Sequence, residues 1–408
     1  MTELSAGPTA NMGTNDHPVV NFDHHGEDFY RTAPEVYAAL RARCPVAYSP
    51  KYGGFWVVSR YDDVFSAARD QALFSAARSV VVPETGIPLL PPLESDPPDL
   101  ERFRSILMPA LSPAAVELMV PAIQSDVTTA IEVFLPEGRC DVVEELANPI
   151  ASRATMRLLG LNPADWRYFA DPLHEASYSQ QNSEVCRAAR ERIHRFAEYI
   201  AREVDARIET PGDDLISRIV TGGGEYAVSR TEAIDLVRMV IFGGMDTVMA
   251  ALSNIFVHLG QDATARRALA SDPSRIPRAI EEFLRLCAPV QGFARTVTRK
   301  CELGGQTLAK GDTLFLLWAS ANRDERIFEN AESFVIDRTP NRHLTFGIGP
   351  HRCLGSGLAR TELRIVLQEF LQRIPDYEIV DDQLVPPATI GIVNGWVSVP
   401  IVFNRASP

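Results

Sequence analysis

The stretch that decides the fold reads Phe346-Gly347-Ile348-Gly349-Pro350-His351-Arg352-Cys353-Leu354-Gly355. Its glycines permit a tight loop with positive φ, in which backbone N–H groups turn toward the cysteine sulfur. A thiolate that receives such hydrogen bonds at the start of a helix stays ionised at neutral pH and can ligate iron. Apolar residues recur at helical spacing from Leu358 to Leu371, so the loop is predicted to open into a helix. Cys353 is therefore a candidate metal ligand, and the alternative is a buried structural cysteine on a turn.

The spacing of Phe346, Gly349, Cys353 and Gly355 resembles the haem-binding loop of the cytochrome P450 family. The resemblance implies that Cys353 is the axial ligand of the iron of haem b, and that the other three residues shape the loop around the cofactor. It covers nearly the whole chain and therefore also implies a fold. That fold is mainly α with a small β region, and a long central helix lies over the haem.

The overall composition is that of an ordinary soluble globular protein. The chain has 408 residues and a net charge of -13, with 46% hydrophobic and 23% charged residues. Together with the resemblance, this length predicts a flexible leader at 1–20 and a single domain at 21–408. The acidic balance argues against nucleic-acid binding, which needs a basic footprint. No apolar run is long enough to span a bilayer and no secretory pattern opens the chain, so we expect a cytoplasmic monomer with no membrane partner.

A long central helix is predicted after the capping box Ser229-Arg230-Thr231-Glu232, because apolar periodicity continues from there past Leu259. About 30 residues at 1.5 Å each would cross the whole molecule. The middle of this helix reads Gly243-Gly244-Met245-Asp246-Thr247. Two helical glycines cost about 1 kcal/mol each relative to alanine, so we expect them to serve the close approach of a flat macrocycle and dioxygen.

Asp246 and Thr247 resemble the acid–alcohol pair of the family, and we predict that they are the catalytic residues. Oxygen activation consumes protons, and a hydroxyl backed by a carboxylate delivers them without flooding the site with water. The alternative interpretation is a helix kink with a solvent-facing aspartate.

Glu282 and Arg285 are three residues apart on a predicted helix, where they can pair on one face. They match the ExxR motif of the family, and Arg338 fits the arginine of the segment that leads to the haem loop. The resemblance implies a structural role for all three, as a buried charge network that is costly to break at one member.

Three residues stand where the family supplies partners for the haem propionates, namely Arg104, Arg295 and His351. Many relatives also carry a histidine four residues before the position of Arg104. Leu100 occupies that position here, so one donor is missing. A structural role is the alternative for each single member of the set.

Within the family, the segments 243–248, 373–376 and 391–393 resemble the camphor-hydroxylating bacterial enzymes. Those enzymes bind a substrate ketone through a tyrosine in an irregular loop, whereas the loop at 82–93 has no tyrosine and Pro88 occupies about its place. The resemblance implies a pocket lined by Leu90, Leu93, Met239, Phe242, Gly243, Val290, Ile392 and Val393. Such an apolar lining selects by shape and burial.

The predicted function is a haem-thiolate monooxygenase that inserts one oxygen atom from O2 into a C–H bond of a small apolar substrate, a terpenoid or norisoprenoid. A [2Fe-2S] ferredoxin with a ferredoxin reductase would supply the electrons. A candidate basic docking patch for it consists of Arg102, Arg352, Arg360 and Arg364. The alternatives are a peroxygenase driven by hydrogen peroxide and a non-catalytic haem-binding sensor.

Two short segments of the N-terminal half also give local predictions. Asp96 precedes Pro97-Pro98 and is expected to cap the helix that carries Arg104. His24 and His25 are adjacent, which invites a metal-binding interpretation, but a solvated loop is expected instead.

Overall fold

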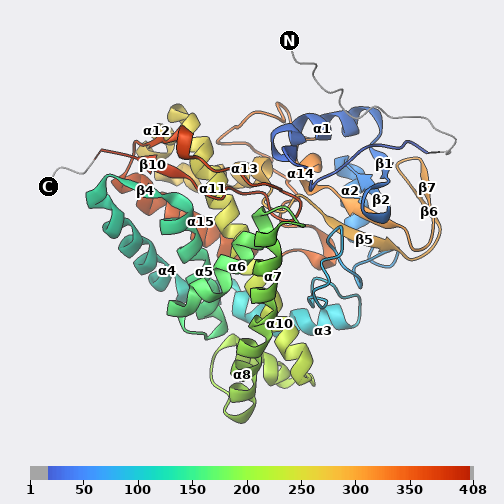
Figure 1. The fold of residues 1–408 in the computed structure, drawn as a ribbon, viewed down its shortest axis with the longest axis horizontal. Coiled ribbons are helices and arrows are strands. Elements are labelled where there is room, and N and C mark those ends of the chain that lie inside the picture. The colour runs from blue at the N-terminus through green and yellow to red at the C-terminus, as the bar shows by residue number, and fades with distance from the viewer. Residues whose placement is uncertain (1–16, 405–408) are drawn as a thin grey trace.

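The computed structural model describes residues 17–404. Helices dominate it, as Figure 1 shows, so the predicted fold class, mainly α with a small β region, is confirmed. The α-helices are α1 (Phe29–Arg43), α2 (Tyr61–Arg69), α3 (Asp99–Leu107), α4 (Pro113–Phe134), α5 (Asn148–Leu159), α6 (Trp166–Tyr178), α7 (Glu184–His194), α8 (Phe196–Glu209), α9 (Leu215–Val220), α10 (Arg230–Gly244), α11 (Asp246–Gln261), α12 (Ala263–Ser271), α13 (Ile276–Cys287), α14 (Trp318–Ala321) and α15 (Ser356–Arg373).

The strands form three small sheets in the described part of the chain. Their order is β1-β2-β8-β5-β3 in the first, β4-β10-β9 in the second and β6-β7 in the third. The first sheet lies with α1 and α2 on one side of the molecule in Figure 1, and most of the helices gather on the other side. The bounds are β1 (Val46–Ser49), β2 (Phe55–Val58), β3 (Phe74–Ser75), β4 (Arg139–Asp141), β5 (Phe293–Val297), β6 (Cys301–Leu303), β7 (Gln306–Leu308), β8 (Thr313–Leu316), β9 (Glu378–Ile379) and β10 (Pro400–Val402).

The first described residues are tied to the first sheet. Val20 N–H donates to the carbonyl of Tyr48, whose own N–H donates to the carbonyl of Pro18, both at 2.9 Å. Val20 is buried as well. Residues 1–16 of the predicted leader lie outside the described residues, whereas residues 18–20 are bound to β1 like an additional strand.

The predicted long helix runs from Arg230 to Gln261 as α10 and α11, with an irregular residue, Met245, between them. Its start is the predicted capping box, because Ser229 accepts from the N–H of Glu232 while Glu232 accepts from the N–H of Ser229. Met245 has φ −82° and ψ −65°, which breaks the regular pattern just before Asp246. The site segment 243–247 therefore lies at a bend in an otherwise continuous helix.

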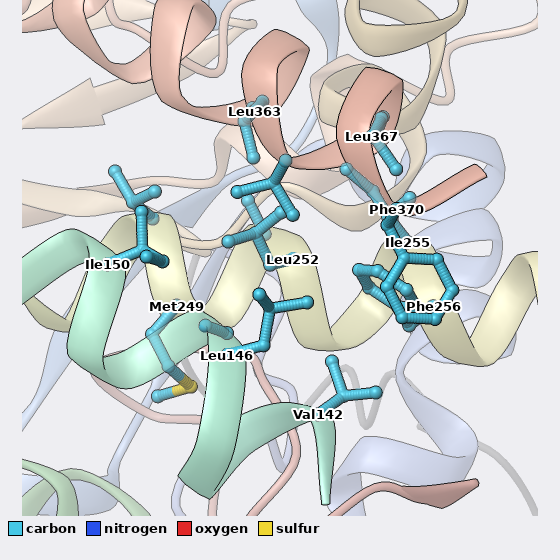
Figure 2. Packing of buried hydrophobic residues seen from close by; sticks show 14 of the residues in the cluster. Val142, Leu146, Ile150, Met249, Leu252, Ile255, Phe256, Leu363, Leu367 and Phe370 are labelled. Carbon is cyan, nitrogen blue, oxygen red and sulfur yellow. The ribbon is translucent and has the colours of Figure 1, made fainter. Parts of the chain in front are cut away.

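The main hydrophobic core surrounds α11. Figure 2 shows how α11 lies between α15 on one side and the segment that leads into α5 on the other. The labelled side chains of this core are Val142, Leu146, Ile150, Met249, Leu252, Ile255, Phe256, Leu363, Leu367 and Phe370. Because α15 follows Cys353 directly and α11 carries Thr247, this core sets the distance between the two halves of the candidate site.

Two helices of the described chain are long and apolar enough to cross a membrane by length and composition. They are Pro113–Glu137 and Arg230–Gln261, and 67% of the apolar window of the second is buried inside the protein. Its hydropathy is explained by the core that it fills. The first packs against α15 with one face and is 22% buried over its window.

Two local expectations were wrong. Asp96 does not cap α3; its carboxylate accepts from the N–H of Ala76 at 2.9 Å and from the hydroxyl of Ser75, which fixes the irregular loop instead. His24 and His25 are buried, and each ring lies within hydrogen-bond distance of the carbonyl of Val82.

His25 also contacts segments far away in the sequence. Its Nδ1 lies 3.1 Å from Nε2 of Gln181, in the turn between α6 and α7, and 3.3 Å from the hydroxyl of Thr389. A Cβ on Gly391 would lie 2.2 Å from the His25 ring, so only glycine fits there. Burial lowers the pKa of His25, and it lowers that of His24 to about 3, so both rings are neutral packing elements.

We predict that Leu252→Ala lowers the free energy of unfolding by about 2–5 kcal/mol, because it removes a fully buried side chain from the core between α11 and α15. Urea unfolding of the holoenzyme measures this. The matched control is Leu118→Ala on α4, where the side chain is 83% exposed, so the unfolding midpoint should hardly change. Equal effects of the two substitutions would contradict this assignment of the core.

Candidate active site

A deep cavity lies between α10–α11 and the loop that carries Cys353. It holds about 1570 Å³ of space not filled by atoms, its open mouth included. Thr247 and Gly243 line one wall, and Phe346, Cys353 and Gly355 line the opposite wall. The cavity therefore brings together the two stretches that the sequence singled out, which are about a hundred residues apart.

The Cys353 loop has the geometry that the glycines predict. Gly347 and Gly349 have φ of 64° and 73°, the left-handed region that favours glycine, whereas Gly355 has an ordinary φ of −77° and begins α15. The N–H of Cys353 donates to the carbonyl of Phe346 at 2.8 Å. A Cβ on Gly349 would come within 3.2 Å of the backbone of Ala68, so α2 also presses on this loop.

Cys353 lines the cavity and its side chain is exposed there. Burial raises its pKa, while the N–H of Gly355 and the charges of Arg104, Arg360 and Arg352 act in the opposite direction. A coordinating metal ion deprotonates such a thiol outright. The donors around the sulfur are therefore arranged for a thiolate ligand rather than for a packed structural cysteine.

Glu282 is the centre of a fully buried charge network behind the loop. Arg285 donates to both of its carboxylate oxygens at 2.8 Å, and both side chains of this pair have no exposed surface. Arg338 donates to the same carboxylate at 2.9 and 3.0 Å, and the N–H of Val335 adds a bond of 3.0 Å. Burial alone would raise the pKa of Glu282, but Arg285 and then Arg338 hold it below its usual value.

This network continues toward Cys353 through a residue that the sequence did not point to. Arg285 donates to the carbonyl of Asn322, whose side chain accepts from the N–H of Leu344 at 2.6 Å and donates to the hydroxyl of Thr345 at 2.8 Å. The haem-loop segment is thus held from behind by amide and hydroxyl groups. No local motif marks Asn322, because its partners are distant in sequence.

Glu281, next to Glu282, makes a second network on the same side. Its carboxylate accepts from Arg360 at 2.6 and 2.7 Å and lies 3.0 Å from His343. Burial would raise the pKa of Glu281, but these partners lower it to about 2. The guanidinium of Arg360 lies 4.3 Å from the centre of the Phe346 ring. Arg360 therefore supports the loop and is not a free surface cation.

Arg104, Arg295 and His351 all line the cavity, as their expected role requires. Neither arginine has a carboxylate partner within the described residues, and Arg295 donates only to the carbonyl of Ala294. The Nε2 of His351 is buried without a hydrogen-bond partner. Burial lowers the pKa of Arg295 to about 10 and that of His351 to about 4.

Two arginines without a carboxylate in salt-bridge distance, beside a histidine whose Nε2 has no partner among the described residues, form a set of donors that suits an anionic group. This donor cluster fits the propionates of haem b, and Cys353 in the cavity wall fits a thiolate ligand of its iron. Leu100 is buried in the core and cannot replace the missing histidine.

Thr247 lines the cavity, while Asp246 lies behind it in the protein. The Thr247 hydroxyl donates to the carbonyl of Gly243 at 2.9 Å, across the bend in the helix. Asp246 is 6% exposed and its Oδ2 has no hydrogen-bond partner in the described structure. The alternative of a solvent-facing aspartate is therefore wrong, because the carboxylate is buried.

Glycine occupies positions 243 and 244 for different reasons. A Cβ on Gly244 would lie 2.4 Å from the hydroxyl oxygen of Thr155 on α5, so this glycine is required by helix packing. A Cβ on Gly243 would meet only the flexible end of Met239 at 3.0 Å. The expected approach of a macrocycle thus remains the reason for Gly243 only.

Half of the predicted substrate residues line the cavity, namely Leu93, Met239, Gly243 and Val290. The other half do not. Phe242 packs against the core around α5, α8 and α10, and Ile392 and Val393 belong to the core around α11. Leu90 contributes its backbone N–H to Glu94 at 2.7 Å, which fixes the loop.

Sequence reasoning missed much of the apolar lining, because helical periodicity does not tell which buried residue faces a cavity. The missed residues include Pro92, Thr155, Val240, Val248, Ala251 and Phe293. Polar groups are scarce: the hydroxyl of Thr155 donates to the carbonyl of Ala151. Gln291 accepts from Tyr37 and donates to the carbonyl of Ala288, so neither end is free. Glu362 on α15 is the exception, because burial raises its pKa well above the usual value and its Oε2 has no partner in the described structure.

The expected basic patch is only partly assembled. Arg102 pairs with Asp99 and with Glu232 at the start of α10, and Arg360 pairs with Glu281. Arg352 is exposed beside Cys353, and Arg69 at the end of α2 is exposed next to Gly349. Arg69 was not expected, because nothing in the sequence places α2 against the loop.

Comparison with known proteins agrees with this geometry. The cytochrome P450 family model matches residues 172–375. Cytochrome P450 130 of Mycobacterium tuberculosis is 33% identical over 366 residues, which cover 86% of this chain and 90% of the relative. Steroid C26-monooxygenase of the same species is 32% identical over 389 residues, with 93% and 96% covered. Linalool 8-monooxygenase of Pseudomonas putida is 30% identical over 364 residues, with 85% and 89% covered.

A solved structure extends the likeness to the whole fold. The crystal structure of CYP101J2 superposes with a TM-score of 0.82 at 30% identity, over 95% of this chain and 97% of that one. The cysteine loop, the buried ExxR network and the arginines without salt-bridge partners thus occur in a chain that resembles these enzymes over nearly its full length. This chain belongs to the bacterial cytochrome P450 family, whose members are monooxygenases that use haem b with a thiolate ligand.

Proposed function

We propose that this chain inserts one oxygen atom from O2 into a C–H bond of a compact apolar substrate, a terpenoid or norisoprenoid. The observation that carries the proposal is the mainly apolar cavity between Thr247 and Cys353, in which the hydroxyl groups of Thr155 and Thr247 already donate to backbone carbonyls. The relative named for linalool, a terpenoid, supports the substrate class. Steroid-named relatives make a larger ring system the competing substrate class.

Haem b bound through Cys353 supplies the oxidising chemistry, and the protein supplies binding, orientation and protons. Arg104, Arg295 and His351 would hold the propionates, and Cys353 would donate the thiolate. The apolar lining excludes water and orients the substrate by shape. Thr247 presents a hydroxyl to the cavity, and Asp246 behind it is the acid that replaces the proton which that hydroxyl gives up.

The proposed electron donor is a [2Fe-2S] ferredoxin served by a ferredoxin reductase. The exposed guanidinium groups of Arg69 and Arg352 flank the Cys353 loop and would attract an acidic partner. A peroxygenase needs no proton-delivery pair, and a carrier without turnover needs none either. The buried Asp246 beside a cavity-lining Thr247 therefore favours the monooxygenase.

Cys353→Ser should abolish the strongly red-shifted Soret band of the reduced carbon monoxide complex, or abolish haem binding. The reason is that serine cannot supply the thiolate that causes the shift. Absorption spectra of the purified proteins measure this. Cys301→Ser, on β6 and away from the cavity, is the control and should keep the band. An unchanged band in Cys353→Ser would end the assignment of the ligand.

Thr247→Ala should keep substrate binding but lose about tenfold or more of the product formed per electron pair, because the protonating hydroxyl is gone. The electrons then appear as hydrogen peroxide. Asp246→Asn should slow turnover by more than it changes binding. Product and peroxide are measured against NAD(P)H consumed. Thr247→Ser retains the hydroxyl and should stay close to wild type; tight coupling in both Thr247→Ala and Asp246→Asn would contradict the assigned roles.

A ketone substrate should bind about as well as a hydrocarbon of the same shape, because burial of apolar surface at about 25 cal/mol per Å² provides the affinity. Spectral dissociation constants of matched pairs test this expectation. A ketone preference of about tenfold, or 1.4 kcal/mol, would reveal a donor to the carbonyl.

A further inference from the structure

Asp246 has a second titratable neighbour that no motif reveals. Nδ1 of His174, on α6, lies 3.8 Å from Oδ1 of Asp246. Nδ1 of His174, Oδ2 of Asp246 and the hydroxyl of Tyr178 are all buried without a hydrogen-bond partner among the described residues. The rings of His174 and Tyr178 are 4.8 Å apart. Three unsatisfied polar groups thus gather directly behind Thr247, where a buried lone carboxylate would be costly.

The surroundings of His174 favour its charged form. Asp246 faces it from α11 and Glu144 from the π-helical turn before α5, where Glu144 is paired with Arg167. Tyr178 is the titratable neighbour on α6 itself, and on α7 Arg192 is paired with Glu175. Burial lowers the pKa of His174, but Asp246, the backbone of Val397 and Glu144 raise it, and the net pKa lies above the usual value.

His174 is also better placed than Asp246 to exchange protons with water. Its side chain is 16% exposed, against 7% for Asp246, and it lies on a different helix from the cavity wall. Thr247 lines the cavity, its chain neighbour Asp246 is buried, and the more exposed His174 faces Asp246 from α6.

We propose that His174 is a positioning residue for Asp246. His174 holds the Asp246 carboxylate in an ion pair and returns protons from solvent to it. This inference rests on the proposed roles of Asp246 and Thr247. A proton leaves Nδ1 of His174 and binds an Asp246 carboxylate oxygen. Asp246 then passes a proton to the Thr247 hydroxyl oxygen as that hydroxyl gives its own proton to the oxygen substrate that is being reduced in the cavity. Neutral His174 regains a proton from water, so charge is restored and no electron moves.

The pH dependence follows from the charge of His174. The imidazolium is present below its pKa in the folded protein and is lost as the pH rises through it, so product formed per electron pair should fall above that pH. His174→Gln should lower this coupling by about tenfold at neutral pH and flatten its pH profile. His174→Lys keeps a cation to higher pH, so coupling should persist above the pH at which wild type loses it. His194→Gln, an exposed site on α7, is the matched control and should behave as wild type.

A direct titration tests the ion pair without turnover. Histidine NMR of the diamagnetic reduced carbon monoxide holoenzyme gives the pKa of His174, with its signal assigned by its loss in His174→Gln. Asp246→Asn should lower that pKa, because the carboxylate that raises it is removed. An unchanged pKa in Asp246→Asn, or a wild-type pH profile in His174→Gln, would overturn the proposal.

The two levels of the hypothesis fail in different ways. If Thr247→Ala and Asp246→Asn stay coupled, the proposed proton-delivery pair is wrong. If those two variants uncouple while His174→Gln does not, the pair stands and only the role of His174 is wrong. The carbon monoxide spectrum of each variant confirms that it is folded around its cofactor before coupling is compared.

Discussion

A carboxylate with no access to water needs hydrogen-bond partners for both of its oxygens. Glu282 is such a group, and the part of the protein behind the Cys353 loop depends on it. Its partners are drawn from α13 and from the segment 335–341, and Arg285 then reaches the carbonyls of Asn322 and Ala331. Removing one partner of such a buried pair typically costs about 3–5 kcal/mol, because the other charge is left unpaired. Through Asn322 this network reaches Leu344 and Thr345, so it anchors the segment that enters the Cys353 loop.

The distal half obeys a steric constraint instead. Gly244 lets α5 approach α10 so closely that the Thr155 hydroxyl fills the place of a side chain. Asp246 and Thr247 are consecutive residues of α11 and therefore point in different directions, Thr247 toward the cavity and Asp246 into the protein. Helix packing and proton delivery thus use the same short segment, which explains why two glycines are tolerated there despite their cost.

The sequence predicted best those features that depend on short spacing. The cysteine loop, the capping box at Ser229 and the pair of Glu282 and Arg285 involve residues within ten positions of each other, and their local geometry is repeated in the structure. Features that depend on distant partners were missed or misplaced. Asp96 accepts a hydrogen bond from Ala76 instead of capping its own helix, and Asn322 bonds to Leu344. His174 lies beside Asp246. Tertiary contacts determine all of these partners.

The substrate lining shows the same limit in another form. Phe242 and Met239 are both apolar and lie three residues apart on α10, yet only Met239 reaches the cavity. Hydropathy distinguishes buried from exposed positions, but it does not distinguish a position that faces packed side chains from one that faces an enclosed space. The resemblance predicted residues on both α10 and the irregular loop, and the structure shows which of them line the cavity.

His25 has a consequence for how this protein moves. One imidazole joins the backbone at Val82, the turn after α6 and the segment at Thr389, which are 57, 156 and 364 residues away in the chain. None of these segments can shift without disturbing the contacts of the other two at the same ring. The three segments therefore form one cooperative unit. We expect them to open together rather than independently. Hydrogen exchange in the three segments should accordingly report a single opening free energy.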